Sequence, residues 1–237
     1  MQALNGVSFI QKGEGKDLLF LHGYLACKET FAAQIDYFSR FFRVTAVDFL
    51  GFGQSAKLTS AFDVQDYADW LAEVIEALGL IKPHVIAHSF GCRVAVKLAY
   101  ARPNSVDKIV LTGAAGIIVN RTLLYHLKVG AYKLIKRIAP RFAERRFGSK
   151  EYRSLSPIMK ESYKKIVNED LRGCAPKVKN QVLIVQGESD KVPTLKEAKV
   201  YESVFENGKL VKMQGGHFAF AERPLVFNLA VEEFLYG

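Results

Sequence analysis

Ser89 lies in a short pattern that suits a nucleophile. The pattern is Ala87-His88-Ser89-Phe90-Gly91, between an apolar segment expected to be a strand and a segment expected to be a helix. A nucleophile at such a sharp turn needs small neighbours, because the strained main chain brings the flanking residues close together. The usual pattern is Gly-x-Ser-x-Gly, and Ala87 replaces its first glycine with another small residue. The helix N-terminus behind Ser89 would also stabilise a developing negative charge.

A serine hydroxyl needs a base to take its proton and an acid to orient that base. Asp190 and His217 each follow an apolar segment expected to be a strand, which is where open α/β sheets place their sites. The order Ser, Asp, His along the chain is the order expected for a nucleophile at this type of turn. We therefore predict Ser89, Asp190 and His217 as the catalytic residues. Glu188 or Asp170 could replace Asp190 as the acid, although neither is placed as well in the loop.

Main-chain N–H groups near Ser89 could bind the oxyanion of the reaction. The segment Leu21-His22-Gly23-Tyr24 follows an expected strand, and this position can donate one N–H group. The second donor comes from the residue after the nucleophile, so we assign the two donors to Tyr24 and Phe90. Losing one such donor typically costs about 3 kcal/mol of transition-state stabilisation. His22 is expected to support this loop.

These residues require a mainly parallel α/β sheet to position them, and the sequence predicts one. Short apolar segments alternate with amphipathic ones, and their continuous apolar character fits strands covered on both faces. The expected strands are 7–11, 18–21, 44–47, 84–87, 108–112, 182–186 and 209–213. The expected helices are 28–39, 64–78, 92–101, 194–204 and 224–235.

The alternation breaks in residues 117–175, where helical patterns follow one another without a strand. We interpret this segment as a helical insertion within a single domain of residues 1–237. The net charge of +9 is concentrated here, because residues 117–180 hold 16 Lys or Arg against 5 Asp or Glu. Residues 121–139 predict a basic amphipathic helix. Its basic face is interpreted as solvated, with attraction of an anionic substrate or an acidic membrane surface as alternatives. No nucleic-acid-binding motif accompanies the charge.

Over nearly its whole length the chain resembles the α/β-hydrolase family, and especially its small bacterial esterase-like members. The resemblance is carried by His22-Gly23, Asp48-x-x-Gly51-x-Gly53-x-Ser55, the Ser89 turn, the Gly187–Pro193 loop around Asp190 and Gly216-His217. It implies an eight-stranded sheet with an antiparallel first strand, flanked by helices, and a helical cap inserted after strand six. The segment 117–175 matches that cap in position. The sequence departs from the family at Ala87, and its N-terminus looks one strand short.

We interpret the chain as a serine hydrolase that cleaves a carboxylic ester, or a related acyl bond, of a small substrate through an acyl-enzyme. One alternative uses the same triad for C–C bond hydrolysis or elimination on an anionic substrate. Arg93 motivates it, because some family members that bind an anionic dicarboxylate have an arginine at this spacing. A structural salt bridge is the other interpretation of Arg93. A further alternative is a hydrolase-fold protein that binds a ligand without turnover. Arg93 and Phe218 are the candidate substrate contacts.

Several other features are expected to be absent. Gly51-x-Gly53-x-x-Ala56 formally resembles a dinucleotide-binding loop, but no helical pattern follows its glycines, so we expect no nucleotide cofactor. The histidines show no metal-ligand spacing, and we expect no metal. Three cysteines without Cys-x-x-Cys spacing suit reduced thiols in a cytoplasm, and Cys92 is expected to be buried and inert. We expect neither a signal peptide nor a membrane-spanning segment. The oligomeric state is left open.

Overall fold

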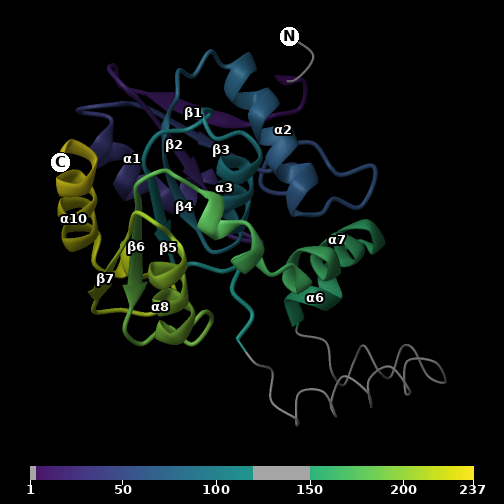
Figure 1. The fold of residues 1–237 in the computed structure, drawn as a ribbon. Coiled ribbons are helices and arrows are strands. Elements are labelled where there is room, and N and C mark those ends of the chain that lie inside the picture. Colours follow the sequence, from purple (N-terminus) through teal and green to yellow (C-terminus); the bar gives the residue numbers. More distant parts are fainter. Residues whose placement is uncertain (1–3, 120–149) are drawn as a thin grey trace.

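The computed structural model describes residues 4–119 and 150–237, which fold around one mostly parallel β-sheet (Figure 1). The described residues form seven strands in the order β1-β3-β2-β4-β5-β6-β7. The strands are β1 Phe9–Lys12, β2 Asp17–Leu21, β3 Arg43–Val47, β4 His84–His88, β5 Ile109–Thr112, β6 Val182–Gly187 and β7 Gly208–Met213. Strand β1 runs antiparallel to β3, and the other five neighbouring pairs are parallel.

The seven segments predicted as strands all form strands, with boundaries that differ by up to two residues. The described residues form one strand fewer than the eight that the family resemblance implies, as an N-terminus that looks one strand short indicated. The segment 117–175 consequently follows the fifth strand, β5, and not the sixth. The difference lies at the edge of the sheet formed by β1, the single antiparallel strand, which pairs directly with β3. The mostly parallel sheet flanked by helices is confirmed.

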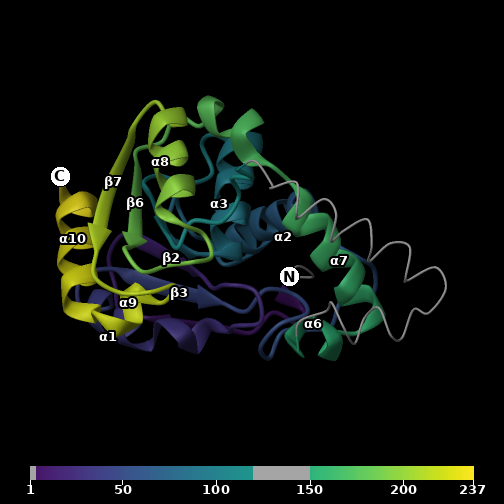
Figure 2. The same ribbon diagram turned by 90° about the horizontal axis from the view of Figure 1, so that it is seen from below.

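Helices cover both faces of the sheet, as Figure 2 shows most clearly. Helices α1, α9 and α10 pack on one face, and α2, α3 and α8 pack on the other. The helices are α1 Ala32–Phe38, α2 Val64–Ala77, α3 Phe90–Ala101, α6 Lys150–Ser154, α7 Pro157–Asn168, α8 Leu195–Val204, α9 Ala219–Glu222 and α10 Pro224–Tyr236, with short 3-10 helices η2 Lys28–Phe31, η3 Leu171–Gly173 and η4 Ala175–Lys177. All five predicted helices are therefore present.

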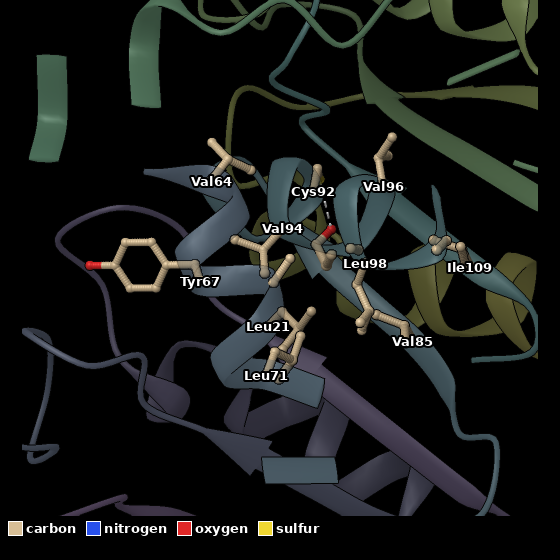
Figure 3. Close-up of a cluster of buried hydrophobic side chains, with 14 of the residues drawn as sticks. Leu21, Val64, Tyr67, Leu71, Val85, Cys92, Val94, Val96, Leu98 and Ile109 are labelled. Carbon is tan, nitrogen blue, oxygen red and sulfur yellow. Dashed lines mark hydrogen bonds between the residues drawn. The ribbon is translucent and has the colours of Figure 1, made fainter. Parts of the chain in front are cut away.

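Each central strand contributes to two hydrophobic layers because its side chains alternate between the faces of the sheet. In β2, Leu19 and Leu21 pack under α2 and α3, whereas Leu18 and Phe20 face α1 and α10. Figure 3 shows the first of these layers, in which Leu71 of α2 lies among the apolar side chains of β2, β4 and α3. This double burial explains the continuous apolar character of the strands.

Helix boundaries follow from local capping. Helix α2 begins after Asp63, whose carboxylate accepts a hydrogen bond of 2.9 Å from the Asp66 N–H, while the Asp66 carboxylate accepts one of 2.8 Å from the Asp63 N–H. Helix α7 begins after Ser156, whose hydroxyl accepts from the Met159 N–H at 3.2 Å, and Pro157 occupies its first turn. These caps satisfy N–H groups that have no partner within the helix.

Between β5 and β6 the chain leaves the sheet and returns to it at directly bonded residues. The Leu171 N–H donates to the Gly116 oxygen at 2.8 Å. Helix α7 of this segment packs beside the loop before α2, where the Ser162 hydroxyl donates to the Phe62 oxygen at 2.6 Å. The basic helix expected over residues 121–139 lies outside the described residues. No helix within the described ranges is long and apolar enough to cross a membrane.

Replacing Leu71 with alanine should lower the free energy of unfolding by about 2–5 kcal/mol, because this side chain is fully buried and its loss leaves a cavity. Leu229→Ala on α10 is the matched control, since Leu229 is 53% exposed and its loss should change stability by less than about 0.5 kcal/mol. Urea unfolding of both variants measures the difference. Similar shifts in the two variants would contradict the position of the core.

Candidate active site

The main chain at Ser89 adopts a conformation that residues other than glycine rarely take. Its φ is +50° and its ψ is −106°, at the point where β4 ends and α3 begins. The Ser89 N–H donates to the Thr112 oxygen at 3.1 Å, and the Ser89 oxygen accepts from the Cys92 N–H at 3.1 Å. Ser89 itself is half-buried, whereas its neighbours His88 and Phe90 are buried. The predicted turn therefore exists, and it presents Ser89 at the carboxyl edge of the sheet.

Small residues permit this turn, as the sequence pattern indicated. A Cβ atom on Gly91 would lie 2.4 Å from the Leu21 oxygen, a distance that no real side chain tolerates. A Cβ atom on Gly23 would lie 2.8 Å from Nδ1 of His88 and 3.4 Å from Cβ of Ser89. Ala87 is fully buried inside β4. The close approaches thus fall on Gly91 and Gly23, and the alanine in place of the usual glycine is accommodated.

Asp190 and His217 form a hydrogen-bonded pair. Nδ1 of His217 lies 2.8 Å from Oδ2 of Asp190, and Oδ1 of Asp190 accepts from the Val192 N–H at 2.7 Å. An ionised carboxylate only accepts hydrogen bonds, so Nδ1 carries the proton and Nε2 is left as the basic nitrogen. Of the other two acids considered, Asp170 pairs with Arg172. The geometry therefore favours Asp190 as the partner of His217.

The Ser89 turn, the end of β5 and His217 meet at one edge of the sheet. Nε2 of His88 lies 2.9 Å from the main-chain oxygen of His217, and the two rings are 4.6 Å apart between centroids. A Cβ atom on Gly113, which follows β5, would lie 3.1 Å from the His217 ring. The structure thus brings together the three predicted catalytic residues, which come from three different connections.

His22 braces the loop that carries one predicted oxyanion donor. Its Nε2 accepts from the Phe49 N–H at 3.1 Å, so its proton lies on Nδ1, which donates to the Gly23 oxygen at 2.7 Å. Burial lowers the pKa of His22 and keeps the ring neutral. The rings of Tyr24 and Phe90, whose N–H groups are the two predicted donors, contact each other at 5.7 Å. This ring contact links the loop after β2 to the first residue of α3.

Asp48 organises the glycine-containing segment after β3. Its carboxylate accepts from the Lys28 N–H at 2.7 Å, from Nζ of Lys28 at 2.8 Å and from the Gln54 N–H at 2.9 Å. Burial raises the pKa of Asp48, but these donors lower it more, so the net pKa lies below its usual range. A Cβ atom on Gly53 would lie 2.2 Å from Cγ of Asp48. Because α2 begins only at Val64, these glycines open no helix, as a dinucleotide-binding loop would require.

The Arg93 side chain is buried and contacts Glu169, near the C-terminal end of the 117–175 segment. One guanidinium nitrogen donates to the main-chain oxygen of Glu169 at 2.7 Å, and burial lowers the pKa of Arg93. The Glu169 carboxylate pairs instead with Lys97 at 2.6 Å. Arg93 thus makes a main-chain contact in place of the expected salt bridge. Phe218, the other candidate substrate contact, is 43% exposed, and its ring lies 5.4 Å from that of His217.

Cys92 is buried as expected, and burial raises the pKa of its thiol. Its Sγ donates to the Ala87 oxygen at 3.2 Å, the contact drawn as a dashed line in Figure 3. A thiol in this setting is protonated and unreactive. Within residues 4–119 and 150–237, no three His, Cys, Asp or Glu side chains form a group that could hold a metal ion.

Sequence reasoning missed two buried polar residues at this edge of the sheet. Gln186, fully buried at the end of β6, donates from Nε2 to the Pro193 oxygen at 3.1 Å and so ties down the loop that carries Asp190. The sequence did carry a signal for Gln186, because a polar residue at the end of an otherwise apolar segment indicates a buried polar side chain with a specific partner. Lys28 gave no such indication, because a lysine at the start of a helix is normally solvated and its contact with Asp48 depends on the fold.

The sequence model of the family described as alpha/beta hydrolase fold matches residues 17–155. Among curated proteins, a segment is 34% identical over 106 residues to (E)-2-((N-methylformamido)methylene)succinate hydrolase from Acinetobacter baylyi, spanning 44% of this chain and 40% of that enzyme. The chain matches less than half the length of the first curated relatives.

Two solved structures are similar over nearly the whole chain. The esterase from Exiguobacterium antarcticum is 22% identical with a TM-score of 0.78, covering 98% of this chain and 96% of that one. The meta-cleavage product hydrolase from Pseudomonas fluorescens is 20% identical with a TM-score of 0.75, covering 97% and 94%. At these identities the likeness establishes the fold.

Replacing Asp48 with asparagine should lower the free energy of unfolding at pH 7 by about 3 kcal/mol, because Lys28 loses its buried counter-charge. The folded-state pKa of Asp48 lies below the unfolded value of about 3.9. Its contribution is therefore fully present above that value and is lost as pH falls through the folded pKa. Urea unfolding should thus show the difference between parent and variant narrowing below about pH 4.

The matched control is Asp36→Asn, since Asp36 pairs with Lys12 on the surface with a side chain that is 72% exposed. Its effect should stay within about 0.5 kcal/mol at every pH. A difference for Asp48→Asn that stays constant down to acid pH would contradict the assigned role of this carboxylate.

Proposed function

Because the chain belongs to the alpha/beta hydrolase fold family, we propose that it is a serine hydrolase that cleaves a carboxylic ester, or a related acyl bond, of a small substrate. The observation that carries this proposal is the hydrogen bond between Asp190 and His217, formed beside the Ser89 turn. An acid, a base and a hydroxyl in this arrangement suit nucleophilic acyl transfer.

In the proposed reaction, Oγ of Ser89 attacks the substrate carbonyl while Nε2 of His217 takes the hydroxyl proton. Asp190 keeps the imidazole in the required tautomer and stabilises its charged form. His217 then returns the proton to the leaving group as the carbonyl bond to that group breaks. Water attacks the resulting acyl-enzyme by the same route, with His217 again acting as the base, and releases the acid and free Ser89.

The oxyanion formed in each step is held by the N–H groups of Tyr24 and Phe90. Phe90 is the first residue of α3, so its N–H has no partner within the helix and points out of the N-terminus. The partial positive charge of that terminus adds to the stabilisation. The His22 brace ties the Tyr24 loop to Phe49, which follows β3, so this donor needs little rearrangement during the reaction.

Exposed apolar side chains near the triad favour an uncharged acyl group. Leu25, Val192 and Phe218 are 49%, 72% and 43% exposed, and each lies within two residues of a proposed catalytic or oxyanion residue. Large apolar side chains that stay exposed beside polar catalytic groups are typical of ligand-binding surfaces. We propose that the acyl group of the substrate covers part of this surface.

Ser89→Ala should reduce kcat/KM for short p-nitrophenyl esters by at least about 10³-fold, because the nucleophile is removed. Asp190→Asn should cause a loss of similar order, since the amide favours the wrong imidazole tautomer. Ser203→Ala is the matched control, because Ser203 is an exposed residue of α8 that bonds only its own helix. Equal turnover by parent and Ser89→Ala would contradict the triad.

A fluorophosphonate probe should label the parent and Ser203→Ala but not Ser89→Ala. This measurement also separates the enzyme from a hydrolase-fold protein that binds a ligand without turnover. Failure of the parent to label, with the fold intact by circular dichroism, would favour the binding protein.

The alternative reaction on an anionic substrate depends on Arg93, and the contact of Arg93 with Glu169 gives it less support. Arg93→Met should change kcat/KM for anionic and neutral esters of the same acyl group by the same factor, so their ratio should stay within about twofold. The ratio is unaffected if part of the variant is unfolded. A selective loss for the anionic ester would instead favour C–C hydrolysis or elimination on an anion.

A further inference from the structure

We propose that His88 is a positioning residue, whose neutral imidazole donates from Nε2 to the main-chain oxygen of His217 and thereby fixes the catalytic imidazole. The inference rests on the proposed function, in which His217 is the base. His88 does not touch the reacting atoms, and it acts through His217.

The contact between the two histidines determines where the His88 proton lies. Nε2 of His88 is 2.9 Å from the His217 oxygen, which can only accept, so Nε2 carries the hydrogen. The other nitrogen, Nδ1, is buried and has no hydrogen-bond partner within the described part of the chain. It faces Gly23, where a Cβ atom would lie only 2.8 Å away. Nε2 thus donates to His217, and Nδ1 accepts no hydrogen bond within the described part of the chain.

The surroundings keep His88 neutral. Its side chain is 1% exposed, and burial together with the nearby His217 lowers its pKa to about 3. A second proton on Nδ1 would create a buried donor with no acceptor, which is unfavourable. The ring is therefore a donor of fixed tautomer at any pH at which the triad works.

An unpartnered nitrogen suggests that packing alone does not explain a histidine at this position. The His88 ring lies against the rings of Phe218 at 4.9 Å and Phe220 at 5.0 Å, and these apolar neighbours offer its second nitrogen no partner. What the histidine adds is the bond to His217. This bond joins His88, the residue before the proposed nucleophile, to His217, the proposed base.

Bonds already hold the two glycines that precede His217: the Gly215 oxygen accepts from the Ser189 N–H at 3.0 Å, and the Gly216 N–H donates to the Glu222 carboxylate at 2.9 Å. Neither of these bonds involves an atom of His217. Asp190 holds the ring of His217, and His88 holds its main chain. Displacing a catalytic group by about 1 Å can cost on the order of 10²-fold in rate.

The test compares His88→Phe with His88→Gln in the full chain. Phenylalanine keeps a ring but donates no hydrogen bond, whereas Nε2 of glutamine can reach the same oxygen. We expect His88→Phe to lower kcat for p-nitrophenyl esters about 10- to 100-fold, with KM within about twofold of the parent. His88→Gln should recover most of this loss.

His84→Phe is the matched control. His84 is also a buried histidine of β4, but it lies at the other end of the strand, where Nδ1 accepts from the Lys108 N–H. This variant should leave kcat within about twofold of the parent, which separates loss of the bond from the general effect of replacing a buried imidazole in this strand.

A second readout does not depend on activity. The proton between Nδ1 of His217 and Asp190 should give a far-downfield proton NMR resonance, identified by its loss in Asp190→Asn. We expect the resonance to shift or broaden in His88→Phe and to return in His88→Gln. An inactive parent that still shows the effect of His88 on this resonance would contradict the proposed function and leave the positioning role supported.

The inference is overturned if His88→Phe keeps both the parental kcat and the parental resonance. It is equally overturned if His88→Gln loses as much as His88→Phe while both variants unfold at the temperature of the parent, since replacing the donor would then restore nothing. If His88→Phe fails to fold, His88→Leu, which also lacks a donor, takes its place in both comparisons.

Discussion

The left-handed main chain at Ser89 is the constraint on which the rest of the site depends. A conformation so unfavourable for a residue with a side chain persists only where its surroundings enforce it. Here the enforcing contacts are close: the Ser89 N–H is bonded to the end of β5, and Gly91 lies against the carbonyl of Leu21 with no room for a side chain. The turn thus fixes the start of α3 to β2, and with it the relation between the serine and the loop that follows β2.

The loops at this edge of the sheet are held mainly by buried side chains that bond to main-chain atoms. His22 braces the loop of Tyr24, Gln186 ties the loop of Asp190, and Asp48 holds the segment that ends at Gln54. His22 and Gln186 do so as neutral groups, and Asp48 does so as a carboxylate whose charge is paired with that of Lys28. Functional sites built on loops generally need hydrogen bonds from surrounding buried residues to keep their geometry.

The sheet could be predicted because its strands are buried on both faces and therefore read as apolar segments. The pairing of Asp190 with His217 was also predictable, because chain order and position after a strand place both at the same edge. The described residues form seven strands and not eight, because the eighth was implied by the family resemblance and not by an apolar segment of this chain.

Contacts between residues far apart in the sequence were harder to predict. Arg93 was expected to form an ion pair or to meet a substrate, but its partner is a carbonyl oxygen, and any residue type could supply that atom. Lys28 likewise meets Asp48 only after the chain has folded. Sequence patterns specify which side chains are buried more readily than which backbone atoms they will reach.

The hydrogen bond between Leu171 and Gly116 joins the two ends of the segment inserted between β5 and β6. Because the chain departs and returns at touching residues, the length of what lies between them hardly affects the strands on either side, and the entropy of closing a longer loop rises only slowly. Arg93 and Lys97 secure the returning end a second time at Glu169. The strands and the loops at their carboxyl edge can therefore stay unchanged while the segment between Gly116 and Leu171 changes in length or sequence.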